Sequence, residues 1–201
     1  MNNQQKEDAA TLEILQVIEN QNDVTQRHLA DKLDVALGLA NSYLKRCVRK
    51  GLVKVQQAPA NRYLYYLTPQ GFSEKSRLTA QYLSSSFNFY RDASSSINQI
   101  YQQCVANNTS RILFCGISEL AEIAAIRSHD YPLNIVGVFD PSATHNKFLD
   151  LPVWGNIKDA DEYDASLLTV VEKSQEVYEL LMLESKPESM FIPSILGVNT
   201  Q

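Results

Sequence analysis

The sequence predicts an α+β domain at its N-terminal end, then a long helix, then a small α/β domain with a parallel sheet. Three observations lead to this prediction. A basic amphipathic helix pattern over residues 36–50 is followed by two strand patterns. A helical pattern starts at Pro69 and reaches about Ala106, and buried-type strands alternate with helices from residue 111 onward. We therefore expect domains at residues 1–70, 71–108 and 109–201.

Residues 36–50 have the periodicity of a helix with one buried stripe. Apolar side chains recur at positions 40, 43, 44, 47 and 48, and the opposite face is polar and basic. Gly51 follows at the position of a left-handed C-cap. The pattern therefore predicts a helix that ends near Lys50.

The charge around this helix has one sign. Between Asp34 and Glu74 there is no acidic residue, although the whole chain has a net charge of −5. A solvated surface normally mixes both signs, so the stretch favours a polyanion such as double-stranded DNA as partner. The alternative is an ordinary surface helix with solvated charges. The six basic residues of the stretch are Lys45, Arg46, Arg49, Lys50, Lys54 and Arg62.

The neighbouring segments complete a winged helix-turn-helix. Residues 9–20 have helical spacing after a frayed tail at 1–8, and Thr25 can cap a second helix over residues 25–33. The chain then turns into the basic helix, which in this motif reads DNA. Strand patterns at 52–57 and 62–68 enclose a turn-rich tip and predict a β-hairpin, the wing. Tyr65 and Leu67 are expected in the core.

The segments QRHLADKLDVALGLANSYLKRCVRKGLVKV and YLYYLTPQGFSEKSRLTAQYL resemble MarR-type winged-helix regulators associated with exopolysaccharide gene clusters. The resemblance covers residues 9 to about 92 and rests on LTPQG, EKSRLT, the LVKV strand and Asn41. It implies a DNA-binding transcription regulator. Ala36 departs from the small hydroxyl residue expected before the reading helix, so one N-cap bond worth about 1 kcal/mol is expected to be missing.

This interpretation assigns DNA contacts to the reading helix and the wing. We expect Asn41 and Ser42 to face base edges, and Arg46 to reach a guanine edge or a phosphate. The other basic residues are expected to neutralise phosphates. The expected DNA-binding residues are Gln26, Arg27, Leu39, Asn41, Ser42, Lys45, Arg46, Arg49, Lys54 and Arg62.

A long helix follows, because Thr68 and Pro69 supply an N-cap and a first-turn proline. The serine cluster at 84–86 is a candidate break. Apolar residues recur at alternating spacings of three and four, which is the pattern of a heptad seam. We expect this seam to form a homodimer, the alternative being that the helix packs on its own domains. The expected dimerisation residues are Leu83, Tyr90, Ala93, Ile97, Ile100 and Cys104.

After a boundary at 107–110, the order strand (111–115), helix and strand (133–140) predicts a βαβ unit. Gly116 follows the first strand, Ser118 lies beside it, and Asp140 closes the second strand near the position of a ribose-binding acid. Only one glycine of GxGxxG is present, and Glu119 adds a negative charge. These residues thus match the phosphate-binding pattern only in part.

With FDPSA and LPVWG, this half resembles the Rossmann-like N-terminal domains found ahead of bacterial sugar-modifying enzymes, and more distantly the core of NADH-sensing repressors. The resemblance implies a nucleotide or nucleotide-sugar, a small anionic metabolite, as effector. The alternative is a domain that kept the fold and lost the ligand, so no cofactor is certain. The expected ligand-binding residues are Gly116, Ile117, Ser118, Glu119 and Asp140.

Competing functions are an enzyme and an adaptor. The sequence has no tyrosine followed four positions later by lysine, no GxSxG and no GxxxxGK[ST], so we expect no enzyme, with a nucleotide-sugar or NAD-dependent enzyme as the alternative. A C-terminal domain that only dimerises or docks a protein is the other alternative. The sequence therefore predicts no catalytic residues.

The overall composition indicates a globular protein with two unlike halves. Residues 1–110 have 12 Lys/Arg against 9 Asp/Glu, whereas residues 111–201 have 6 against 14. The three cysteines lie in apolar segments without metal spacing and are expected to be buried thiols, and the three histidines support no metal site. Without an apolar run of about 20 residues or a signal-peptide core, we expect a cytoplasmic protein that binds no membrane.

Overall fold

The computed structural model describes residues 3–59, 62–184 and 189–199. The chain forms two compact units, Met1–Phe87 and Asn88–Gln201. Their boundary falls inside one long helix, so the segment expected as a separate linker belongs to both units. Within the described residues, no helix has the length and apolar character needed to cross a membrane.

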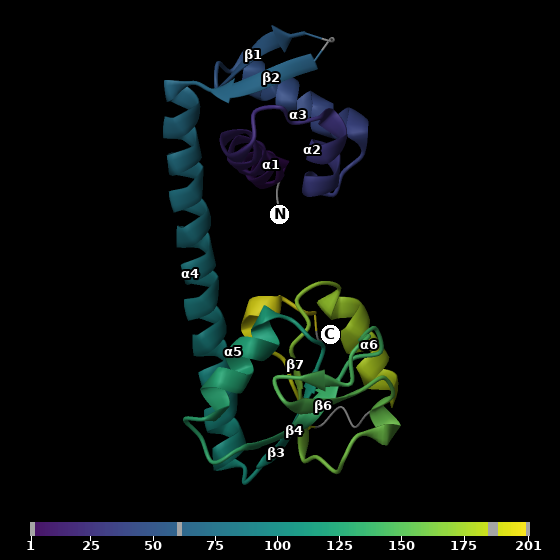
Figure 1. Cartoon of the computed structure of the whole chain (residues 1–201). Coiled ribbons are helices and arrows are strands. Elements are labelled where there is room, and N and C mark those ends of the chain that lie inside the picture. Colours follow the sequence, from purple (N-terminus) through teal and green to yellow (C-terminus); the bar gives the residue numbers. More distant parts are fainter. Residues whose placement is uncertain (1–2, 60–61, 185–188, 200–201) are drawn as a thin grey trace. The chain divides into compact units, whose positions relative to one another are not determined.

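The first unit consists of three helices and a hairpin, followed by the start of the long helix (Figure 1). Its core is formed by the inward faces of these helices together with Leu52, Val53 and Tyr65. The elements are α1 (Asn3–Asn20), α2 (Gln26–Leu33), α3 (Leu37–Arg49), β1 (Val53–Ala58), β2 (Arg62–Leu67) and α4 (Pro69–Ala106).

Helix α1 corrects one prediction, because it begins at Asn3 and most of the expected frayed tail is helical. Gln4 Nε2 donates to Asp8 Oδ1 at 2.7 Å one turn later. Glu7 also forms an ion pair with Arg46 of α3. These contacts involve polar side chains, so the apolar periodicity that marks residues 9–20 did not extend to them.

The ends of α2 and α3 follow the predicted chemistry. Thr25 Oγ1 accepts a hydrogen bond from the His28 amide at 3.1 Å and caps α2. Ala36 precedes α3 without a side-chain cap, and Gly51 takes φ +70° directly after the helix. Strands β1 and β2 pair in antiparallel register, from Val53 opposite Leu67 to Ala58 opposite Arg62.

Helix α4 is continuous through the serine cluster that was a candidate break. Its start is fixed by Thr68, whose hydroxyl donates to the Gly51 carbonyl and accepts from the Gly71 amide at 3.0 Å. Position 71 requires glycine, because a Cβ there would lie 2.1 Å from the Leu52 carbonyl oxygen. The first turn of α4 thus packs directly on the segment between α3 and β1.

The second unit has a six-stranded mixed sheet of order β5-β6-β4-β3-β7-β8. Every neighbouring pair is parallel except β5 and β6. The elements are β3 (Arg111–Cys115), α5 (Glu119–Ser128), β4 (Asn134–Phe139), β5 (Lys147–Phe148), β6 (Leu151–Trp154), η1 (Ile157–Asp159), β7 (Ala165–Leu168), α6 (Ser174–Glu184), β8 (Met190–Phe191) and η3 (Ser194–Leu196).

Helices cover both faces of this sheet. Alternation along β3 sends Ile112 and Phe114 to the face packed by α5 and the last turns of α4, and Leu113 and Cys115 to the face packed by α6. The fully parallel sheet of the prediction is corrected, because the chain between β4 and β6 makes the short antiparallel strand β5 instead of a crossover helix.

The heptad interpretation of α4 is also corrected for four residues. Each is at most 7% exposed and belongs to the core of the second unit, where it packs against the sheet and α5. Three-four spacing marks one apolar stripe but does not say what covers it, and here the chain's own sheet covers it. The four residues are Ala93, Ile97, Ile100 and Cys104.

Candidate nucleic-acid interface and ligand pocket

A groove of about 420 Å³ lies between the reading helix α3 and the wing. Asn41, Lys45 and Arg49 line it from α3, and Gln26 lines it from the first turn of α2. The wing contributes Val55, Tyr63 and Tyr65. No acidic residue of the described part of the chain lines this groove, so Lys45 and Arg49 act there without a competing carboxylate.

Two residues of the groove hold the wing in place. Tyr65 is 6% exposed, and its amide donates to the Asn22 carbonyl at 2.8 Å. Burial raises the pKa of Tyr65, and a side-chain hydrogen bond with Gln26 opposes that rise. The expected core role of Tyr65 is therefore confirmed, and Gln26 has a partner inside the chain.

Other expected DNA contacts on α3 lie outside this groove. The Ser42 hydroxyl donates to the Gly38 carbonyl at 2.9 Å, and Leu39 is 45% exposed. Arg46 Nη1 lies 2.5 Å from Glu7 Oε1 of α1, so its guanidinium is already paired with a carboxylate. Sequence reasoning missed this pair because Glu7 fell in the segment assigned as a tail. Arg27 is exposed on α2.

The wing residues divide between two faces. Val55 pairs with Tyr65, and Gln57 with Tyr63, so these side chains share the face toward α3. Lys54 and Arg62 occupy alternate positions and lie on the other face, which separates Lys54 from the groove. Arg62 is next to the hairpin tip, where its Nε donates to the Pro59 carbonyl at 3.4 Å.

Tyr63 is a candidate contact that sequence reasoning missed. It lines the groove and is 53% exposed, so its hydroxyl is accessible to a ligand. The signal was available in the strand period, because Tyr63 has the same parity as the buried Tyr65. An exposed tyrosine beside Lys45 and Arg49 can donate a hydrogen bond to a phosphate oxygen.

Comparison with known proteins supports a DNA-binding role for this unit. Residues 7–54 match the family of winged helix-turn-helix DNA-binding domains. The match runs from α1 through α3 to the first residues of β1. Because the match ends at residue 54, it concerns the N-terminal winged helix-turn-helix alone. No protein with a curated functional description matches the chain.

Several solved structures are similar to parts of the chain. A MepR-like protein complexed with pseudoligands is 15% identical, with a TM-score of 0.34 over 40% of this chain and 60% of that one. The PcaV transcriptional regulator from Streptomyces coelicolor is 16% identical, with a TM-score of 0.40 over 49% and 74%. The S. aureus MepR–DNA complex is 20% identical, with a TM-score of 0.36 over 44% and 62%. The chain thus spans about three fifths of two of these proteins.

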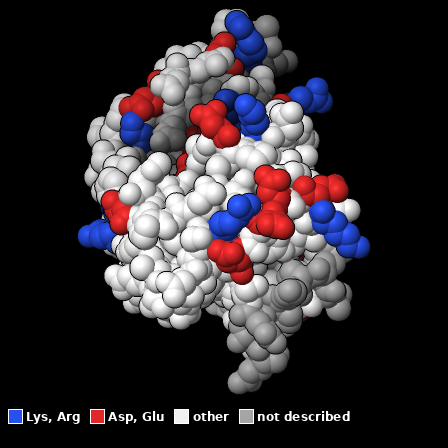
Figure 2. Space-filling view, turned by 90° about the horizontal axis from the view of Figure 1, so that it is seen from below, with Lys and Arg blue, Asp and Glu red and all other residues white. Residues whose placement is uncertain are grey.

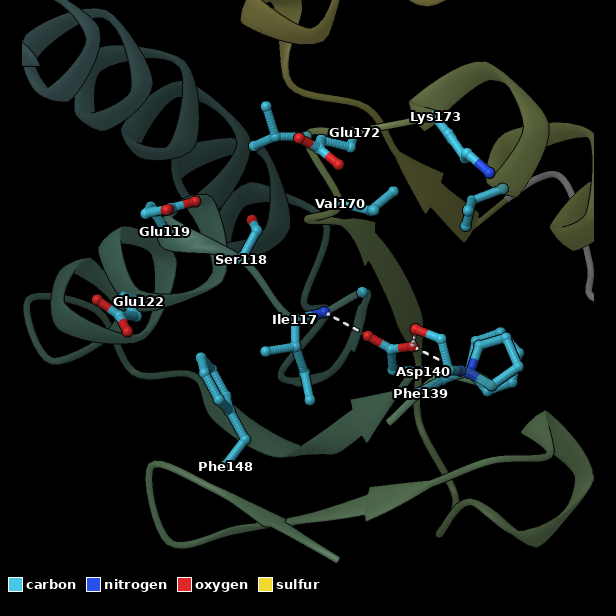
Figure 3. Close-up of a pocket in the computed structure, with 15 residues that line it drawn as sticks. Ile117, Ser118, Glu119, Glu122, Phe139, Asp140, Phe148, Val170, Glu172 and Lys173 are labelled. Carbon is cyan, nitrogen blue, oxygen red and sulfur yellow. Dashed lines mark hydrogen bonds between the residues drawn. The ribbon is translucent and has the colours of Figure 1, made fainter. Parts of the chain in front are cut away.

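A second cavity, of about 770 Å³, lies at the carboxyl ends of β3, β4 and β7 in the second unit. Figure 3 shows the side chains that line it, which come from the ends of β3, β4 and β7 with the loops that follow them, from α5 and α6, and from β5 through Phe148. The structure brings all five expected ligand-binding residues to this one cavity. They are Gly116, Ile117, Ser118, Glu119 and Asp140.

Asp140 has a structural function in this cavity. Its Oδ2 accepts the Ile117 amide at 2.9 Å, and its Oδ1 accepts the Ser142 amide and hydroxyl at 2.9 and 2.7 Å (Figure 3). The side chain is 9% exposed. Both carboxylate oxygens are therefore engaged in holding the loops after β3 and β4 together.

Ser118 is likewise occupied by the chain. It caps α5 by accepting the Leu120 amide at 3.0 Å, and its hydroxyl donates to the Thr169 carbonyl. Gly116 takes φ +101°, and a Cβ there would lie 2.4 Å from Val170 Cβ. The glycine thus permits close contact with the loop after β7 and leaves no room on that side for a ligand.

Several lining residues were missed by sequence reasoning, namely Glu122, Phe148, Glu172, Lys173 and Val177. Those after β7 follow a buried strand, LLTVV, which is adjacent in the sheet to β3. Sequence order alone places them about 55 residues from Gly116, and only the strand order brings them to the same edge.

The cysteines and acidic groups provide no further reactive centre. All three thiols are buried as expected, and burial raises the pKa of Cys47 and Cys104 to about 11 and that of Cys115 to about 12. They remain protonated at neutral pH and are weak nucleophiles. In the part of the chain that the structure describes, no group of three or more His, Cys, Asp or Glu could hold a metal ion.

Proposed function

We propose that this protein is a DNA-binding transcription regulator of the MarR type, and that the groove between α3 and the wing seats the DNA backbone. The observation that carries the proposal is the groove itself, which has Lys45 and Arg49 on its walls and no carboxylate. The family match over residues 7–54 and the sequence resemblance over 9–92 support it.

The residues of the groove divide the binding between two tasks. Lys45 and Arg49 neutralise phosphates, and the Tyr63 hydroxyl donates to a phosphate oxygen. Asn41 is half-buried at the same groove and offers an amide that can pair with an adenine edge. Arg46 contributes to base reading only when its pair with Glu7 opens.

The test is a salt titration of DNA affinity by fluorescence anisotropy, on a duplex selected by binding from a random pool. Lys45→Ala and Arg49→Ala should each flatten the slope of log affinity against log salt by about one unit, because each removes one phosphate contact. Lys54→Ala is the matched control, since Lys54 lies on the opposite face of the wing. If the salt slope is the same for all three variants, the groove is not part of the DNA interface.

For the second unit we propose ligand sensing in the cavity beside Gly116, with occupancy passed to the DNA-binding unit through α4. The parallel strands β6, β4, β3, β7 and β8 have the chain order 3-2-1-4-5, which supports a Rossmann-like classification, and such sheets bind ligands at the carboxyl ends of their strands. The nucleotide or nucleotide-sugar implied by the sequence resemblance is one candidate effector.

We propose a homodimer from the heptad spacing and from the part of α4 that belongs to the first unit. There Leu83 is 46% exposed and the adjacent Tyr82 is 64% exposed. Tyr90, a further residue of the expected seam, is 38% exposed and its hydroxyl accepts from Arg127 Nη2 at 3.3 Å. Leu83 is therefore the seam residue on which the dimer proposal now rests.

A further inference from the structure

The cavity at the carboxyl ends of β3, β4 and β7 has an acidic rim. Glu119 and Glu122 project into it from α5, and Glu172 projects from the loop after β7 (Figure 3). All three are exposed, and no ion pair neutralises them among the described residues. Among the described residues, Lys173 is the one cation that lines the cavity, so the rim repels an anion.

Two groups that could hold a phosphate in a nucleotide-binding loop are already used within the chain. The Ile117 amide donates to Asp140, and the Ser118 hydroxyl donates to the Thr169 carbonyl. The glycine whose open face admits a pyrophosphate in such loops is here covered by Val170. A phosphate entering this loop would break one of these bonds and meet Glu119 as well.

The carboxylate at the position of a ribose-binding acid is also hydrogen-bonded within the chain. Asp140 accepts three hydrogen bonds from Ile117 and Ser142, which leaves little capacity for a 2′-hydroxyl. A nucleotide in this cavity would therefore lack the Ile117 amide, the Ser118 hydroxyl and most of the Asp140 carboxylate as partners.

What the cavity does offer is an apolar wall below a carboxylate rim. Ile117, Phe148, Val170 and Val177 form the wall. A bare metal ion gains nothing from such a wall, and the carboxylates are not grouped closely enough to coordinate one. A molecule with an apolar body and an ammonium group can bury the body against the wall and place its charge among the carboxylates, with Phe148 available for a cation–π contact.

We infer that this cavity binds a small organic cation, an amine with an apolar body, and not a nucleotide. The site itself is argued from the cavity at the strand ends, and its ligand class from the charge and the occupied donors. The inference rests on the proposal that the second unit senses a ligand here, and it names the chemical class of that ligand.

The experiment is calorimetric titration of the full-length protein with three probes. Phenethylamine carries the proposed chemistry, 2-phenylethanol has the same body without the charge, and UDP represents the nucleotides. Phenethylamine should bind at least about tenfold more tightly than 2-phenylethanol, because only its ammonium gains from the carboxylates. Added salt should weaken the binding of phenethylamine and leave the binding of 2-phenylethanol unchanged.

Two variants locate the binding. Glu172→Gln should raise the Kd for phenethylamine by about two- to fivefold, the range expected for one exposed charge pair. Lys173→Gln, next to it on the same loop, should lower the Kd, because it removes the one repelling cation. Circular dichroism spectra that match the parent protein would show that both variants fold.

The outcomes separate the inference from the proposal beneath it. If UDP binds and phenethylamine does not, the cavity binds an anion. The inference of an organic cation then fails, and the proposal of ligand sensing stands. If no probe binds at millimolar concentration, ligand sensing fails with it, whereas the DNA salt titration still tests the first unit. Equal Kd values for Glu172→Gln and the parent protein would place the amine elsewhere.

Discussion

At the scale of single residues, two residues of the second unit match a nucleotide-binding pattern but have structural roles. Gly116 matches the first glycine of a dinucleotide-binding loop, yet the structure explains it by φ +101° and by contact with Val170. Asp140 matches the ribose-binding acid, yet it ties two loops together. Both residue types were predicted at the correct edge of the sheet, and the role assigned to each changes with its contacts.

Replacing this glycine tests the structural role. Gly116→Ala should lower the free energy of unfolding by about 1–3 kcal/mol, because alanine is strained at positive φ and its Cβ collides with Val170. Gly155→Ala is the matched control, since nothing lies within 4 Å of the added Cβ, and should change stability by less than about 0.5 kcal/mol. Urea unfolding followed by circular dichroism measures both. Comparable stability of the two variants would contradict the packing explanation.

At the scale of elements, α4 shows that an apolar stripe does not specify its partner. The seam from Ala93 to Cys104 was expected to face a second copy, and it faces the sheet and α5 of its own unit. Leu83 is part of the same frame but stays exposed in the first unit. A single periodic pattern is therefore divided between core and surface along one helix.

This division predicts opposite effects at two positions of α4. Ile97→Asp should destabilise the second unit by about 4 kcal/mol or more, because it buries an unpaired carboxylate. Leu83→Glu should leave the unfolding free energy within about 0.5 kcal/mol of the parent and weaken any self-association. Denaturant titration and sedimentation velocity distinguish these results. A parent protein that sediments as a monomer at micromolar concentration would end the dimer proposal.

At the scale of the whole molecule, the two cavities differ in charge. The groove of the first unit has Lys45 and Arg49 and no acid, whereas the cavity of the second unit has four carboxylates and one lysine. The face shown in Figure 2 has acidic and basic side chains interspersed, as an ordinary solvated surface does. Because the two sites differ in charge, the ligands that we propose for them, DNA and a small organic cation, would not compete for the same groups.

If the units are coupled, the coupling must be reciprocal. An effector that changes DNA affinity by about tenfold requires DNA to change effector affinity by the same factor, since both express one coupling free energy. We expect this for whichever probe binds beside Gly116. The measurement is probe titration with and without saturating duplex DNA. Unchanged probe affinity in the presence of DNA would favour the alternative in which the second unit is a dimerisation or docking scaffold.

The sequence by itself determined the elements of the first unit, apart from the first turns of α1, and the chemistry at the ends of α2, α3 and α4. Period 3.6 in α3, period 2 in the wing, the Thr25 and Thr68 caps and the turn at Gly51 are local properties, and the structure has each of them. The acid-free charge pattern likewise predicted a face for DNA, because charge is read directly from residue types.

Only the tertiary structure decided what covers each apolar stripe and which loops meet. The strand order placed Glu172 and Lys173 beside Gly116, the register put Lys54 and Val55 on opposite faces of the wing, and the fold of α1 paired Glu7 with Arg46. These outcomes depend on contacts between residues far apart in the chain. Local periodicity fixes the face of an element but contains no information about its neighbour, so the ligand class had to be inferred from the assembled cavity.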